Sequence, residues 1–135
     1  MTDLENAICN LDGHSLCLCK GDIVNTYDER GIVPMMKLIS QGTELTGFSA
    51  ADRIVGRAAA MLFVKAGVVN VYGKVMSDGA KEYLENHGIS CSYDTLTEKI
   101  INRQGNDICP MEKAVMHIEN ENEGYNVLLV KMRGI

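Results

Sequence analysis

A helix that runs directly into a buried strand limits the fold of this chain more than any other part of its sequence. The stretch from Ala58 to Val64 is apolar on nearly all sides, which is typical of a helix buried around its circumference. This helix is expected to stop at Gly67, and the largely apolar, β-branched run from Val68 to Val75 follows at once. Such a run is typical of a strand inside a sheet that is covered on both faces. The sequence therefore predicts an α/β protein.

The flanking segments continue the alternation of helix and strand. Two runs of extended character meet at Gly21 and Asp22 and predict a β-hairpin. Patterns that resemble capping boxes place helix starts at Ser49 and Thr95, and Gly134 follows the last helix. The predicted helices cover residues 4–11, 32–39, 49–66, 78–86, 95–101, 110–117 and 121–133, and the predicted strands 15–20, 23–27, 68–75 and 89–93. We expect a three-layer α/β/α sandwich with a mixed sheet, whose later strands run parallel through right-handed crossovers.

Composition indicates the class of protein. The 135 residues, 46% hydrophobic and 23% charged, predict a single domain over residues 1–135. The formal net charge of −5 argues against a general nucleic-acid binder, and the longest apolar run is far too short to cross a membrane. The acidic start without a signal segment predicts a cytoplasmic protein, in which the five cysteines are expected to be free thiols.

One cysteine lies where a thiolate should be favoured. A turn leads to Cys109, and Pro110 is suited to be the first residue of a helix, so Cys109 is its expected N-cap. Glu112 falls at the third helical position, where its side chain can reach back to the cap. Free backbone N–H groups at this helix start would make Cys109 reactive. The simpler alternatives are a cysteine that only packs and a glutamate that only caps.

A second group of candidates surrounds the helix start predicted after Ser49. Asp52 could act in acid–base chemistry or could merely belong to a capping pair. Arg53 and Arg57 would lie one turn apart, with Gly56 between them allowing close approach of a backbone or a ligand. Two such cations beside a helix N-terminus could hold a phosphate or a carboxylate. A solvated surface pair, or a pair of partners for Asp52 and Glu112, is at least as reasonable an interpretation.

No metal or cofactor is predicted. The three histidines are scattered along the chain at ordinary positions, so they do not suggest a metal site. Cys17 and Cys19 form a C-x-C pattern on a predicted strand, but no second cysteine pair accompanies them. We interpret these two thiols as sheet packing.

Three segments resemble a small family of uncharacterised prokaryotic proteins grouped with the cytidine deaminase-like fold. They cover residues 49–60, 100–103 and 108–114. The resemblance implies a deaminase-like arrangement, in which true deaminases place His-x-Glu or Cys-x-Glu at one helix start and Pro-Cys-x-x-Cys at another. Three of those side chains bind zinc and the glutamate moves protons. The matching positions here supply at most Cys109, Glu112 and Asp52, so we expect a site without zinc.

These observations lead to three functional hypotheses. The first is a pocket that binds a small anionic or nucleotide-like molecule; in an enzyme, Cys109 would be the nucleophile or redox thiol and Glu112 or Asp52 the acid or base. The second is a non-catalytic module that senses a ligand, a metal such as iron, or redox state. The third is a structural role, in which the sheet and the apolar tail helix around Leu128 and Leu129 form a homodimer and the site is vestigial. The residues expected to line the pocket are Asp52, Arg53, Gly56, Arg57, Cys109, Glu112 and Lys113.

Overall fold

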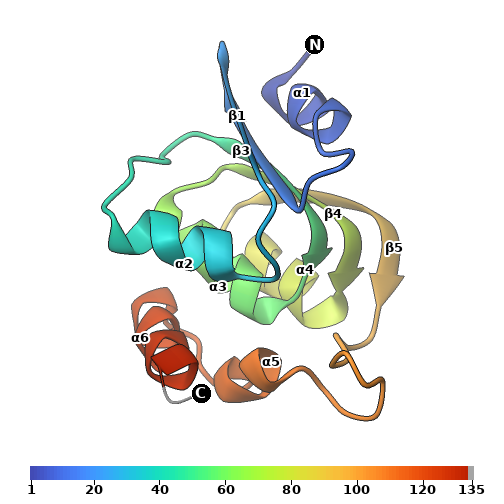
Figure 1. Ribbon diagram of the computed structural model, residues 1–135, viewed down its shortest axis with the longest axis vertical. Coiled ribbons are helices and arrows are strands. Elements are labelled where there is room, and N and C mark those ends of the chain that lie inside the picture. Colours follow the sequence, from blue (N-terminus) through green and yellow to red (C-terminus); the bar gives the residue numbers. More distant parts are fainter. Residues whose placement is uncertain (134–135) are drawn as a thin grey trace.

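The fold is built on a five-stranded mixed sheet with strand order β2-β1-β3-β4-β5, seen in a computed structural model that describes residues 1–133 (Figure 1). Strand β1 runs antiparallel to both β2 and β3, whereas β3, β4 and β5 run parallel. The hairpin and the mixed α/β architecture predicted from the sequence are confirmed. The strands are β1 (Leu16–Lys20), β2 (Ile23–Tyr27), β3 (Ser49–Val55), β4 (Asn70–Ser77) and β5 (Ser90–Thr97).

Helices cover the two faces of the sheet unequally. One face carries only α1, and the other carries the remaining helices, as Figure 1 shows. The larger core lies between the sheet and these helices, and the smaller core lies beneath α1 around Ala7, Cys17, Cys19 and Tyr72. Most of β5 is exposed, so the face with α1 stays partly open. The helices are α1 (Asp3–Cys9), α2 (Val33–Ser40), α3 (Arg57–Ala66), α4 (Asp78–Asn86), α5 (Pro110–Val115) and α6 (Glu121–Arg133).

Two predicted helix starts are wrong. Residues 49–55 form strand β3, and the following helix begins only at Arg57, with Gly56 as its N-cap. Residues 95–97 are the end of β5, where Thr97 pairs with Ser77, and Ile101 then forms an isolated bridge. In both places the local sequence favours a helix start, but the segment forms a strand because it gains hydrogen-bonded neighbours in the sheet.

Helix α6 packs against the larger core. Leu128 of α6 is fully buried in the larger core, and Leu129 is partly buried against it. The predicted dimer through these leucines therefore stays a prediction, and Leu128 is not available to it without opening the core. The predicted helix stop at Gly134 lies outside the described residues. None of the helices within residues 1–133 is long and apolar enough to cross a bilayer.

Candidate functional site

Glu112 joins the N-termini of α3 and α5. Its Oε1 accepts a hydrogen bond from the Arg57 backbone N–H at 2.7 Å, and its Oε2 accepts one from the Ala58 N–H at 2.8 Å. The glutamate therefore caps α3, not its own helix as the sequence suggested, and its charge meets the positive end of the α3 dipole. Burial raises the pKa of Glu112, an effect opposed by the two backbone donors and by the nearby Arg57 charge.

Gly56 permits this contact. A Cβ atom at position 56 would lie 2.3 Å from Oε1 and 2.5 Å from Cδ of Glu112, far inside van der Waals contact. The close approach that we expected at Gly56 is thus made by a carboxylate of the same chain. An external anion at this helix start would have to displace Glu112.

The Arg57 side chain is engaged with the end of α5. Its Nε donates to the Val115 carbonyl at 3.1 Å, and its Nη2 donates to the carbonyl of Ile118 and to the carboxylate of Glu119. The guanidinium also lies 4.9 Å from the centre of the Tyr83 ring. The expectation that Arg53 and Arg57 share one helix face is wrong, because Arg53 belongs to strand β3.

Cys109 is the N-cap of α5, as predicted, and is a partly exposed free thiol. However, its side chain accepts no hydrogen bond from the first turn, and α5 has only six residues. Lys113 is exposed and pairs with Asp107 in the preceding loop. The charge of Lys113 therefore already has a partner in the same chain.

Asp52 is a buried acid within the sheet. It pairs in register with Leu16 and Gly73, and its Oδ1 accepts a long hydrogen bond of 3.4 Å from the Ile54 N–H. It forms no ion pair with any residue of 1–133, and burial raises its pKa to about 7. Four residues of extended strand, roughly 13 Å at about 3.3 Å per residue, separate it from the Gly56 helix start. Asp52 is thus not part of the cap that Glu112 forms.

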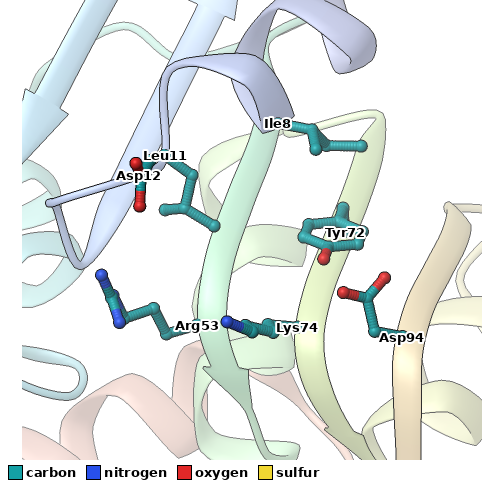
Figure 2. A pocket seen from close by; sticks show the side chains of 7 residues that line it. All are labelled: Ile8, Leu11, Asp12, Arg53, Tyr72, Lys74 and Asp94. Atoms are coloured by element: carbon teal, nitrogen blue, oxygen red, sulfur yellow. The ribbon is translucent and has the colours of Figure 1, made fainter.

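A cleft opens on the other face of the sheet, beside the end of α1. Its volume is about 170 Å³. Arg53 of β3, Lys74 of β4 and Asp94 of β5 form one lateral row, because the residues before and after each of them are paired in register. Figure 2 shows this row below the α1 end. The lining residues are Ile8, Leu11, Asp12, Arg53, Tyr72, Lys74 and Asp94.

The charges in this row are not neutralised by one another. Arg53 Nε donates to the His14 carbonyl at 2.6 Å, but neither Arg53 nor Lys74 forms an ion pair with any residue of 1–133. Like charges on neighbouring strands ordinarily destabilise a sheet. Burial and the adjacent Asp94 carboxylate raise the pKa of Tyr72 to about 12, so its hydroxyl keeps its proton at neutral pH.

Sequence reasoning found only Arg53 of this cleft. Lys74 carried a usable signal, since it is a charged residue inside a strand that is otherwise largely apolar. The sequence carried no such signal for Asp12, Tyr72 and Asp94, because their positions in the cleft depend on how the strands align. The structure therefore divides the predicted residues: Gly56, Arg57 and Glu112 meet at the α3 start, with Cys109 at the start of α5, while Arg53 lies in the cleft.

Together, the mixed sheet and this cleft define a small α/β protein with a polar, partly covered sheet face. The chain belongs to the TM1506 family, described as a domain of unknown function (DUF1893), whose profile matches residues 6–132. It is similar to the crystal structure of a DUF1893 family protein (TM1506) from Thermotoga maritima, with 25% sequence identity and a TM-score of 0.86. The match covers 97% of this chain and 91% of that one. No curated protein matches the sequence.

Proposed function

We propose that this protein binds a small molecule through an anionic group held by Arg53 and Lys74. The observation that carries the proposal is the pair of neighbouring cations, without ion-pair partners among residues 1–133, that line a concave cleft. A carboxylate or phosphate would offset the repulsion between these two charges. A guanidinium is well suited to that task because it can donate two parallel hydrogen bonds to such a group.

The proposal keeps the ligand class expected from the sequence but places its anion away from Cys109. At the α3 start, Glu112 already accepts the two backbone hydrogen bonds that an external anion would need. Arg57 donates to carbonyl groups, and Lys113 pairs with Asp107. In the cleft, Arg53 donates to residues 1–133 only through its Nε, to the His14 carbonyl, so both terminal nitrogens of its guanidinium remain available to a ligand. Lys74 forms no ion pair with any residue of 1–133.

Titration with inorganic phosphate and with acetate, followed by backbone amide NMR shifts, tests the proposal. We expect shifts around Arg53 and Lys74, and binding weakened about 10-fold or more in Arg53→Met and Lys74→Met, the loss of one charge-assisted hydrogen bond. Lys113→Met is the matched control, since it removes an exposed lysine from the other candidate site. Shifts confined to α5 and lost in Lys113→Met would refute the proposal.

A second candidate function is thiol chemistry at Cys109. It is favoured by the partial exposure of this free thiol at the start of α5. The test is the rate of maleimide labelling at Cys109 relative to the exposed Cys9, with Cys109→Ser identifying the signal. A rate at Cys109 below that of Cys9 at neutral pH would remove the support for a nucleophile or redox sensor.

We also propose that the fold is related to that of cytidine deaminases. Support comes from the meeting of the α3 and α5 N-termini through Glu112, which brings two helix starts together as the resemblance implies. The first of these starts lies at Gly56, not after Ser49 as the sequence suggested. Residues 1–133 contain no cluster of three or more His, Cys, Asp and Glu side chains that could hold a metal ion. Metal analysis of protein purified without chelator should find no stoichiometric zinc or iron. Metal that is lost in Cys109→Ser would instead favour metal-assisted chemistry or metal sensing.

A further inference from the structure

We infer that the ligand of this cleft is a small zwitterion, an amino acid or a similar aminocarboxylate, whose ammonium group binds Asp94. The inference rests on the proposed function, because the carboxylate of the same molecule would bind Arg53 and Lys74. The inference adds two properties of the ligand, namely the positive group at its other end and its size.

The charges of the lateral row indicate a ligand with two oppositely charged ends. Asp94 is the register neighbour of Lys74 on the adjacent parallel strand, where an ion pair would be expected. None forms: the Lys74 side chain extends toward β3, and the Asp94 carboxylate points toward the Tyr72 hydroxyl (Figure 2). The row thus presents two cations followed by one anion. Its complement is a molecule with a negative group at one end and a positive group at the other.

The size of the cleft limits the ligand. Its volume of about 170 Å³ is smaller than the roughly 300 Å³ at which sites for drug-sized ligands begin. A nucleotide would extend out of it, whereas an amino acid has the appropriate size. The side chains of Ile8 and Leu11 and the Tyr72 ring provide an apolar wall for the carbon chain between the two charged groups.

A second acid, Asp12, lines the opposite end of the cleft. It follows α1, and Figure 2 shows it above the Arg53 guanidinium. An ammonium at Asp12 would lie close to that cation, whereas an ammonium at Asp94 would be separated from Arg53 by the carboxylate bound between them. This difference favours Asp94 as the binding partner of the ammonium.

Matched ligand pairs test the inference. The probes are glycine, β-alanine, 4-aminobutanoate and 5-aminopentanoate, each compared with the carboxylate that lacks the amino group, in NMR titrations of the whole chain. We expect at least one amino acid to bind about 10-fold more tightly than its partner. Asp94→Asn should abolish that gain while carboxylate binding persists, Lys74→Met should weaken both ligands, and Asp12→Asn should keep the gain.

The outcomes separate the two proposals. If carboxylates bind the cleft and the amino group adds no affinity, the inference fails and the proposed function stands. If the gain disappears in Asp12→Asn but persists in Asp94→Asn, the inference also fails. If phosphate, carboxylates and amino acids all leave the cleft resonances unchanged, both proposals fail.

Discussion

Replacing Gly56 by alanine should expel the Glu112 carboxylate from the start of α3. The new methyl group would lie 2.3 Å from Oε1 and 2.5 Å from Cδ, and the carboxylate cannot keep both of its hydrogen bonds while moving away. A hydrogen bond to a charged group contributes about 1.5–3 kcal/mol, and hydration of the released carboxylate offsets part of the loss. We therefore expect the free energy of unfolding to fall by about 2–4 kcal/mol.

A double-mutant cycle assigns this cost to the contact itself. In the Glu112→Ala background the added methyl group meets no carboxylate. The remaining cost of Gly56→Ala is then that of alanine as a less favourable N-cap, about 0.5–1 kcal/mol. The coupling between the two sites should then be at least about 1 kcal/mol. Gly79→Ala is the matched control, because a Cβ there would meet no atom within 4 Å, and it should not destabilise the protein.

Urea unfolding at pH 7, followed by circular dichroism, measures all four members of the cycle and the control. The comparison requires similar m-values, so that midpoints report stability and not a change in the unfolded state. Equal costs of Gly56→Ala in the presence and absence of Glu112 would refute the assignment.

Three further predictions concern side chains elsewhere in the protein. Because burial raises the pKa of Asp52 from 3.8 to about 7, its contribution to stability is full below pH 4 and is lost as the pH rises through 7. Asp52→Asn should therefore exceed the wild type in urea resistance at pH 8. Arg57→Met should cost about 2–4 kcal/mol in the same assay, because it removes the donors to the end of α5. Cys17 and Cys19 are fully buried and should be alkylated only on unfolding, as mass spectrometry would record, whereas Cys9 reacts in the native state.

Each of these predictions has a clear contrary result. An Asp52→Asn variant that keeps the wild-type pH dependence would show that another group causes it. An Arg57→Met variant that unfolds at the wild-type urea concentration would mean that the end of α5 is held by other contacts. Native-state alkylation of Cys17 would mean that α1 opens independently of the rest of the fold.

Much of the fold could be predicted because its signals are local. The hairpin has a turn with a glycine at positive φ, Gly21, and α4 begins as predicted at Asp78, where Ser77 accepts a capping hydrogen bond from the Ala80 N–H. Apolar periodicity located α1, α2 and α6, since their inward faces pack on the cores. Each of these features depends on residues that are close to one another in the sequence.

The errors arose where distant partners decide the structure. Ala50 and Ala51 are both buried, one toward each core, so β3 has no alternating pattern and resembles a helix that follows a capping serine. The Cys109 to Glu112 spacing suggested a local cap, yet the carboxylate binds α3 more than 50 residues earlier in the chain. Arg53, Lys74 and Asp94 are 21 and 20 residues apart and meet only through strand register.

The two candidate sites differ in whether their charged side chains have partners within the same chain. At the helix junction, Glu112, Arg57 and Lys113 each have a partner in the same chain, and the first two connect α3 to α5. On the open face, the exposed side chains of Arg53 and Lys74 come from neighbouring positions of β3 and β4, and neither forms an ion pair within residues 1–133. Local rules of stability are broken most often where a protein binds something else. A bound anion would offset the repulsion between these charges, and for this reason we propose the ligand site on the open face.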